Sequence, residues 1–137
     1  MIDTTRPQII DLPRIYDPRG NLTFVQDMDQ IPFAIRRAFW VYDVPAGEER
    51  GGHAYHEAAE VIVAVGGAFN VNLFDGTDWV TYQLNRPYRA LYVPPLYWRT
   101  LDNFASGSVC MALMPTEYDE QDYIRDFEEY KRIRRKK

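Results

Sequence analysis

The sequence predicts an all-β sandwich or barrel followed by one C-terminal helix, and three features support this class. Short apolar runs recur about every ten residues, with Pro, Gly and Asp between them. The run containing Phe69, Val71 and Leu73 alternates with asparagines, and the Asp75-Gly76 pair after it favours a hairpin turn. Convincing helical periodicity, by contrast, is confined to a segment near the C-terminus.

The expected strands follow one another along most of the chain. In order they cover residues 9–16, 22–26, 37–44, 52–56, 60–65, 69–74, 79–84, 91–93, 97–101 and 109–114. Pro13 interrupts the first strand, which is therefore expected at a sheet edge. A helix is expected over about 119–133, because Asp119 is a suitable N-cap and Ile124 and Phe127 begin an apolar stripe at helical spacing.

Length and composition narrow the class of protein. With 137 residues and no repeat or linker, the chain is expected to be a single domain, 1–137. The net charge of −4 argues against nucleic acid as a partner, and the basic RIRRKK tail is expected to be a solvated chain end. No apolar run approaches the ~20 residues of a membrane span, and the pattern of a signal peptide is absent. The lone Cys110 is expected to be a buried strand residue, so the sequence favours a reducing, cytoplasmic location.

Both histidines lie in one stretch whose residue spacing matches a known pattern. The pattern is G-x5-H-x-H-x4-E-x6-G, the first motif of the cupins, and it is matched by Gly47, His53, Tyr55, Glu60 and Gly67. A tyrosine thus stands where the motif has its second histidine. The chain is therefore expected to form a cupin, which is a double-stranded β-helix or jelly roll, with the C-terminal helix docked on it.

The second cupin motif, P-x-G-x2-H-x3-N, has a weaker counterpart in which Arg99 replaces the third histidine. Metal-binding cupins use three histidines and a glutamate, and two of these histidines are absent. His56 is not an obvious substitute, because residues three apart on a strand point to opposite faces and His56 would point away from His53. A metal site needs three or four convergent ligands, so we expect no metal and no cofactor. A metal-dependent cupin stays open as an alternative, since the backbone after His56 could be irregular.

His53 and Tyr55 share one strand face and form the candidate catalytic pair. Histidine is the default general base near neutral pH. Tyr55, with an unperturbed pKa near ~10, is a poor base at neutral pH but can donate a hydrogen bond or a proton to a developing oxyanion. The alternative is that His53 is an ordinary core histidine.

Four segments share patterns with one family of enzymes. Segment 42–54, YDVPAGEERGGHA, is similar to an Arg-Gly-x-His-Ala-His signature. Segments 17–22, 91–98 and 118–125 are similar to the patterns D-x-RG-x-L, YIPP…W and Y-x-E-x-DYIR. Together they resemble the nucleotide-sugar 3,4-ketoisomerases, over about residues 6–132.

The resemblance implies a metal-independent enzyme that acts on TDP-4-keto-6-deoxyglucose in deoxysugar biosynthesis. The keto group would move from C4 to C3 through an enediol, with two histidines of one strand face beside the C3–C4 bond. His53 matches the first histidine and Tyr55 stands at the second. Three outcomes are open: Tyr55 serves as acid or oxyanion donor while His53 moves both protons, His56 enters through a bulge, or the protein binds a nucleotide sugar without isomerising it.

Arginines and aromatic residues are the expected contacts of a nucleoside diphosphate, because guanidinium groups pair with phosphate oxygens and a base stacks on aromatic rings. The candidate arginines are Arg19, Arg37, Arg50 and Arg99. The candidate aromatic residues are Trp40, Tyr42, Tyr97 and Trp98, of which Tyr42 and Trp98 lie in segments similar to the family's. The family resemblance also implies a homodimer, in which N-terminal strands are often exchanged. The competing functions are a non-catalytic nucleotide-sugar-binding cupin and an isomerase or epimerase of a related keto-sugar.

Overall fold

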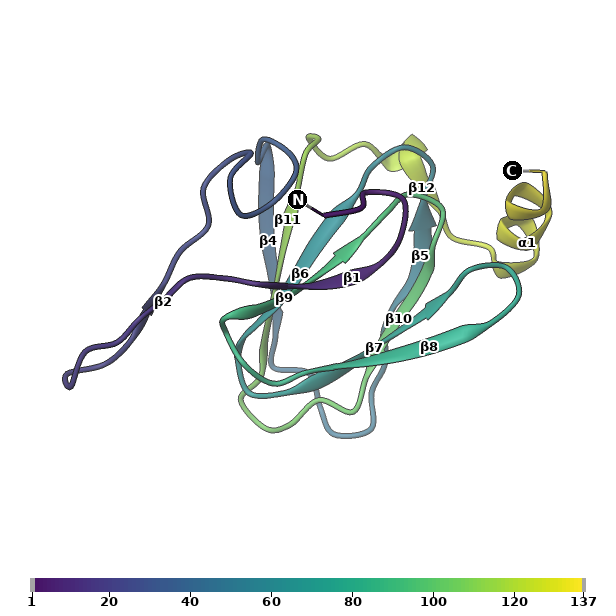
Figure 1. Cartoon of the computed structure of the whole chain (residues 1–137). Helices are drawn as coiled ribbons and strands as arrows, with labels where there is room; N and C mark the ends of the chain where they lie inside the picture. The colour runs from purple at the N-terminus through teal and green to yellow at the C-terminus, as the bar shows by residue number, and fades with distance from the viewer. Residues whose placement is uncertain (1, 137) are drawn as a thin grey trace.

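The computed structural model describes residues 2–136, which form two five-stranded antiparallel sheets that face each other (Figure 1). The first sheet has the order β1 (Gln8–Asp11), β9 (Arg89–Val93), β6 (Glu60–Gly66), β11 (Val109–Met114) and β4 (Arg37–Tyr42). The second has the order β12 (Tyr123–Ile124), β5 (Arg50–Tyr55), β10 (Trp98–Asp102), β7 (Phe69–Phe74) and β8 (Trp79–Leu84). The predicted all-β architecture is confirmed, and β1 lies at a sheet edge as Pro13 indicated.

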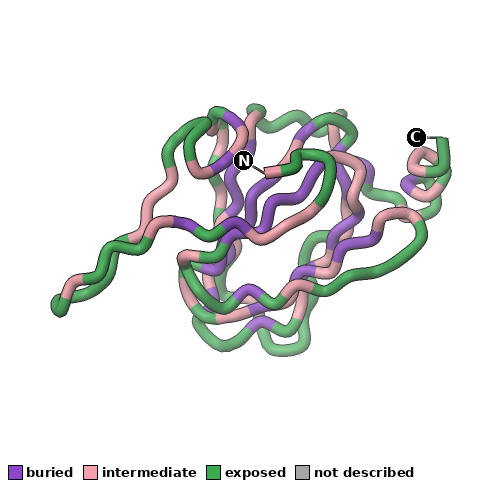
Figure 2. The backbone as a smooth tube through the Cα atoms, in the orientation of Figure 1, coloured by how far each residue is buried: buried purple, intermediate pink, exposed green. Residues whose placement is uncertain are grey.

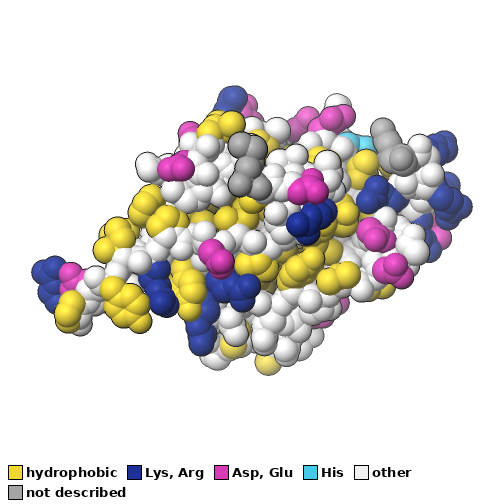
Figure 3. All heavy atoms as spheres, in the orientation of Figure 1, with side chains coloured by type: hydrophobic (Ala, Val, Ile, Leu, Met, Phe, Trp, Pro, Cys, Tyr) yellow, Lys and Arg dark blue, Asp and Glu magenta, His cyan; other side chains and the backbone are white. Residues whose placement is uncertain are grey.

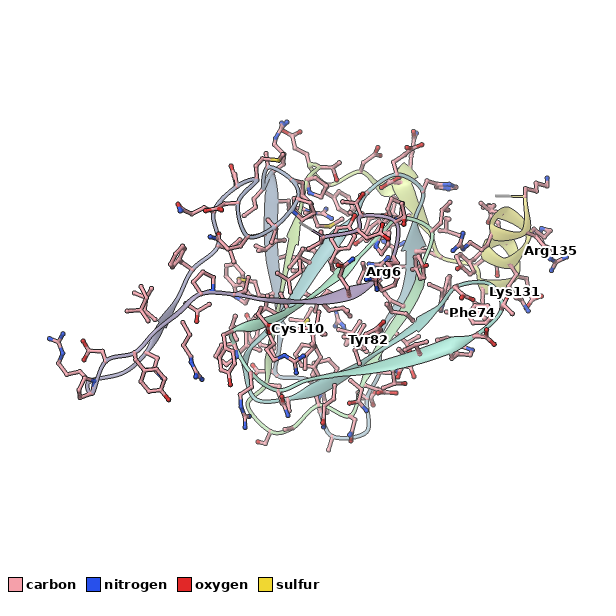
Figure 4. The ribbon with its side chains drawn as sticks, viewed as in Figure 1. Arg6, Phe74, Tyr82, Cys110, Lys131 and Arg135 are labelled. Carbon is pink, nitrogen blue, oxygen red and sulfur yellow. The ribbon has the colours of Figure 1, made fainter. Side chains whose placement is uncertain are left out.

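The main core lies between the two sheets, where buried backbone is concentrated (Figure 2). Alternate residues of β6 and β7, such as Ile62, Val71 and Leu73, point into this space and exclude water. Cys110 lies in the same core, as expected, and burial raises the pKa of its thiol to about 12 (Figure 4). The inner hollow of the site borders this core, because Ile62, Leu101 and Cys110 belong to both.

Each sheet is also covered on its outer face. The loop that carries Ile31 and Phe33 packs over Val61 and Val63, so β6 is apolar on both faces. On the other sheet, helix α1 (Phe127–Arg135) packs over the buried ring of Trp98, and Phe74 lies beside this helix in Figure 4. The second sheet is thus fixed between the core and the helix.

The prediction of a helix over 119–133 is wrong at its start. Asp119 caps only a short 3-10 turn, η1 (Glu120–Asp122), and the chain then forms the strand β12 before the helix begins. The true N-cap is Asp126, whose carboxylate accepts a hydrogen bond from the backbone N–H of Glu129. The spacing Asp126-x-x-Glu129 resembles a capping box and is the local signal for this later start.

A two-stranded arm, formed by β2 (Arg14–Ile15) and β3 (Leu22–Thr23), projects from the barrel (Figure 1). The strand expected at 22–26 is therefore shorter than predicted. Figure 3 shows apolar side chains along this arm and at its junction with the barrel. Ile15, Tyr16 and Leu22 are more than half exposed there, at 53%, 75% and 54%.

No helix among residues 2–136 has the length and apolar character needed to cross a membrane.

Candidate active site

The site is built on β5, whose sequence RGGHAY places a bulge beside the histidine. In the pairing of β5 with β10, His53 lies opposite Arg99 and Gly51 lies opposite Thr100, so Gly52 is an extra residue. Both glycines have positive φ, and a Cβ on Gly51 would lie 3.0 Å from the carbonyl oxygen of Arg99. Because the bulge changes the alternation of faces, Arg50 lines the same hollow as His53.

Three aromatic rings meet on the inner face of β5. The ring centroids of His53 and Tyr55 lie 5.0 Å apart, which confirms that the two share a face. Tyr123 of β12 completes the group, at 5.0 Å from His53 and 4.8 Å from Tyr55. The hydroxyl of Tyr55 donates a hydrogen bond to the hydroxyl of Tyr123 at 3.4 Å. His56 is exposed and its backbone N–H bonds to Asp122, so it takes no part in this group.

The environment of His53 keeps its imidazole neutral. Burial, and then the positive charges of Arg99 and Arg125, lower the pKa of His53 to about 3. A backbone hydrogen bond at Gly51 acts in the opposite direction and is outweighed. Its Nε2 atom is buried and has no hydrogen-bond partner among the described residues. A free lone pair is thus available in the pocket, as a general base requires.

Tyr55 is held in its protonated form. Its burial and the nearby carboxylate of Glu60 raise the pKa of the phenol well above its usual value, against the opposing charge of Arg99. The guanidinium of Arg99 lies 4.8 Å from the centre of the Tyr55 ring. At neutral pH this residue can donate a proton in a hydrogen bond and cannot serve as a base.

Arg99 and Glu60 form an ion pair that is buried between the sheets. The Nη1–Oε1 distance is 2.5 Å, and the two side chains are 1% and 4% exposed. Nη2 of Arg99 also donates to the carbonyl of Tyr97 at 2.9 Å. Arg99 therefore lines the inner hollow as expected, but with part of its hydrogen-bonding capacity already used within the protein.

Tyr123 and Arg125 were not predicted as site residues, because the expected helix covered both. The pairing of β12 with β5 puts Tyr123 directly opposite Tyr55, so the two side chains share a face. Arg125 lies over the Tyr123 ring at 4.2 Å and is held by two hydrogen bonds to Glu120, of 2.6 and 3.0 Å. The same arginine holds the pKa of Glu120 at about 2, so the carboxylate stays charged.

Two neighbouring hollows, which share lining residues, lie at His53. An outer hollow of about 360 Å³ is lined by Phe39, Glu49, Arg50, Gly51, His53, Tyr55, Tyr123 and Arg125. An inner hollow of about 90 Å³ shares several of these residues and reaches Glu60 and Arg99. A third hollow, of about 400 Å³, lies between Tyr42 and Arg50. Arg50 lines all three.

Of the other residues predicted to contact the substrate, Arg37 lies near the site, whereas Trp98 and Arg19 do not. Arg37 lies near the site, over the rings of Phe39 and Tyr118, and its charge helps to lower the pKa of His53. Trp98 and Arg19 are not brought to the site within the chain. Trp98 points outward under α1, because neighbours on a strand face opposite ways and Arg99 points inward. The prediction that Trp98 lines the pocket is therefore not met.

Arg19 lies at the tip of the arm, on the other side of the molecule from β5 (Figure 1). Its side chain is 90% exposed and pairs with Asp17 at 2.9 Å. A substrate contact of Arg19 within its own chain, as the sequence suggested, is therefore not found.

The site does not fit a cupin metal. No three His, Cys, Asp or Glu side chains among residues 2–136 converge to hold a metal ion. The guanidinium of Arg99 occupies the position of the third histidine and neutralises Glu60, the ligand that the motif retains. A cation placed there would meet a fixed positive charge.

The two facing sheets, with an imidazole and phenols between them, define the chain as a cupin with acid–base groups at its site. A family model described as FdtA: WxcM-like, C-terminal, matches residues 5–135, and the chain belongs to this family. The family resemblance and the fold class predicted from the sequence are thereby confirmed.

Characterised relatives are similar over nearly the whole chain. A TDP-4-oxo-6-deoxy-alpha-D-glucose-3,4-oxoisomerase from Aneurinibacillus thermoaerophilus is 35% identical over 125 residues, which cover 91% of this chain and 90% of the relative. The sugar 3,4-ketoisomerase QdtA from Thermoanaerobacterium thermosaccharolyticum, solved with TDP, superposes with a TM-score of 0.94 at 30% identity, covering 96% of each chain. A 3,4-ketoisomerase from Helicobacter canadensis gives a TM-score of 0.92 at 32% identity, covering 94% of this chain and 97% of its own.

The buried ion pair predicts a large loss of stability when one partner is removed. Glu60→Ala leaves the Arg99 charge uncompensated, and the free energy of unfolding should fall by about 3–5 kcal/mol. Glu117→Ala is the matched control, because it breaks the exposed Arg36–Glu117 pair, 59% and 78% exposed, and should cost less than about 1 kcal/mol. Urea unfolding measures both, and equal losses would show that the buried pair has no special weight.

The low pKa of His53 predicts that stability falls as the pH drops below about 6.5. In this range the unfolded chain takes up a proton at position 53 and the folded chain does not, so protonation favours unfolding until the pH nears 3. Between pH 7.5 and 5.5, wild type should lose about 1 kcal/mol more than His53→Asn, as measured by urea unfolding. Parallel losses in the two proteins would mean that His53 is not held neutral.

Proposed function

We propose that this chain is a TDP-sugar 3,4-ketoisomerase that acts on a TDP-4-keto-6-deoxyhexose in deoxysugar biosynthesis. The observation that carries the proposal is the partly buried, neutral imidazole of His53, whose Nε2 has no partner among the described residues, beside tyrosine hydroxyls in a pocket lined by arginines. A neutral base and a protonated acid on one face are what an enediol mechanism needs. The relatives named above carry the same activity in their names.

His53 is the base of the proposed reaction. It removes the proton at C3 while the C4 carbonyl oxygen becomes an enediol hydroxyl, and it then returns a proton to C4 as the carbonyl forms at C3. The tyrosine pair beside His53, Tyr55 at the second histidine position of the family and its neighbour Tyr123, supplies the acid: one hydroxyl gives its proton to the C4 oxygen in the first half and takes the O3 proton back in the second. No step requires a metal, since each group only moves a proton.

The arginines and Tyr42 account for the nucleotide. Arg50 lines both the hollow beside Tyr42 and the hollow at His53, so its guanidinium is suited to the diphosphate between the base and the sugar. Arg37 adds positive charge near His53, at the sugar end, and Arg99, paired with Glu60, lines the inner hollow there. TDP itself is the ligand of the QdtA structure, which supports a thymidine diphosphate here.

The test is incubation with TDP-4-keto-6-deoxyglucose in deuterated water, followed by NMR at C3 and C4. Wild type should exchange the C3 proton and form a 3-keto product, and His53→Asn should lower kcat by about 10² to 10⁴-fold. The matched control is His56→Asn, which changes the exposed histidine outside the pocket and should keep wild-type turnover.

TDP binding separates this proposal from a non-catalytic binding protein. Calorimetry of wild type with TDP should give saturable binding that His53→Asn retains. Binding without exchange or product in wild type would identify a binding module and end the isomerase proposal. A product altered at another carbon would point to the related isomerases or epimerases.

We further propose that the protein is a cytoplasmic homodimer whose arms are exchanged. A two-stranded hairpin with exposed Ile15, Tyr16 and Leu22 is marginal by itself in water. A groove of about 690 Å³ at the base of the arm, lined by Val63, Val65 and other apolar residues of the outer sheet face, offers a place for the partner's arm. Exchange would also carry Arg19 to the partner.

Sedimentation tests the dimer. Wild type should sediment as a dimer, and Ile15→Asp should shift it toward monomer, because the charge would be buried in the interface. Val80→Asp is the control, since Val80 is exposed to nearly the same extent, 50% against 53% for Ile15, but lies on β8, away from the arm. A monomeric wild type, or equal effects of the two changes, would count against exchanged arms.

A further inference from the structure

The two tyrosines at the site differ in how far they are exposed. Their hydroxyl oxygens lie 3.4 Å apart, so the two hydroxyls contact each other inside the protein. Tyr55 is 1% exposed, whereas Tyr123 is partly exposed at the outer hollow. The hydroxyl whose proton remains available to a molecule in the hollow is therefore that of Tyr123.

Resting on the proposed function, we propose that Tyr123 is the catalytic acid of the isomerisation and that Tyr55 acts through it as a positioning residue. The Tyr123 ring lies 5.0 Å from the His53 ring, so an acid and a base flank the same space. A sugar in that space would present C3 to the imidazole and its adjacent oxygens to the phenol. This moves the acid from the position of the missing histidine to the neighbouring strand.

The proton balance of the reaction closes with these two residues. His53 takes the proton from C3, the C3–H electron pair forms the C3–C4 double bond, and the C4 oxygen takes the Tyr123 proton to give the enediol. In the second half, the O3 hydroxyl returns a proton to the Tyr123 oxygen while C4 takes the proton from His53. Both residues end as they began, and no oxidant or reductant is needed.

Tyr55 has a definite task in this scheme. While the Tyr123 oxygen is deprotonated, the hydrogen bond from Tyr55 stabilises its negative charge, because hydrogen bonds to charged groups are stronger than neutral ones. Its own proton stays in place, because burial and then the negative charge of Glu60 raise the pKa of the Tyr55 phenol. The Tyr55 hydroxyl thus stabilises the Tyr123 oxygen without losing its own proton.

The backbone around Tyr123 is held firmly enough for an acid. The carbonyl of Asp122 accepts the N–H of His56 at 2.9 Å, and its carboxylate accepts the N–H groups of Glu57 and Ala58 at 2.8 and 3.2 Å. On the other side of Tyr123, Ile124 is buried under α1. Strand β12 is short, but hydrogen bonds of Asp122 fix its start and the burial of Ile124 fixes its end.

The Tyr123 ring is held as well. Arg125 lies over it at 4.2 Å, and Glu120 fixes this arginine while also accepting a hydrogen bond from Tyr118. A cation over a ring restrains the ring's position. Arg125 is itself a poor candidate for the acid, because its guanidinium stays charged and two of its donors are used by Glu120.

The order of two hydroxyl deletions tests the assignment, with wild-type turnover of TDP-4-keto-6-deoxyglucose measured first. Tyr123→Phe should lower kcat by about 10² to 10⁴-fold with little change in KM. Tyr55→Phe should lower kcat by only about 10- to 100-fold, the effect of losing one hydrogen bond to a charged group. The matched control is Tyr82→Phe, which removes a hydroxyl from β8 outside the site (Figure 4) and should keep wild-type kcat.

Each result has one meaning. A Tyr123→Phe protein with an unchanged melting temperature and the larger loss supports the assignment. If Tyr55→Phe is the more damaged variant, Tyr55 is itself the acid and the assignment is wrong. If wild type turns over and Tyr123→Phe does so equally well, the assignment fails and the proposed function stands. If wild type binds TDP but does not react, the proposed function fails and this role with it.

Discussion

The ion pair between Arg99 and Glu60 is the constraint on which the site depends. It joins β10 of one sheet to β6 of the other, buried in the space between them. A lone buried charge there would cost several kcal/mol, so each partner requires the other. The pair also supplies fixed charges: Arg99 lies against the Tyr55 ring and lowers the pKa of His53.

The positive charges of the pocket affect both the basicity of His53 and the binding of a diphosphate. Burial, and then the charges of the arginines around His53, keep the imidazole neutral, while the same charges attract a diphosphate. Binding of two phosphates would offset part of this positive field and make His53 a stronger base when substrate is present. A base that strengthens on binding is thus a consequence of using arginines both for recognition and for packing.

The sequence predicted the sheets well, because strand alternation and turn residues act locally. The clean alternation of Phe69, Val71 and Leu73 became β7, and the motif spacing placed His53 and Tyr55 on one inner face. The C-terminal segment was harder to predict, because the apolar stripe that suggested a helix at 119–133 also fits a short strand covered by a helix.

Which side chains face the site was less predictable, because strand pairing rather than local sequence decides it. Trp98 and Arg99 are neighbours in the second motif, and only the pairing of β10 decides which one faces inward. Tyr123 joins the site because β12 pairs with β5, a tertiary contact that no local pattern encodes. Likewise, Arg19 could be matched to a family pattern, although the arm that carries it leaves the barrel.

The pairing of β12 with β5 also governs when the protein can become active during synthesis. Tyr55 and Tyr123 are 68 residues apart in the chain. A nascent chain exposed only as far as β11 can pair most of its strands, yet β5 still presents an open edge and the pocket lacks one wall. Contacts this distant in sequence close late and slowly. Under the proposed mechanism, catalysis therefore starts only after residues 120–126 have left the ribosome, and until then the exposed edge of β5 is a point at which misfolding can begin.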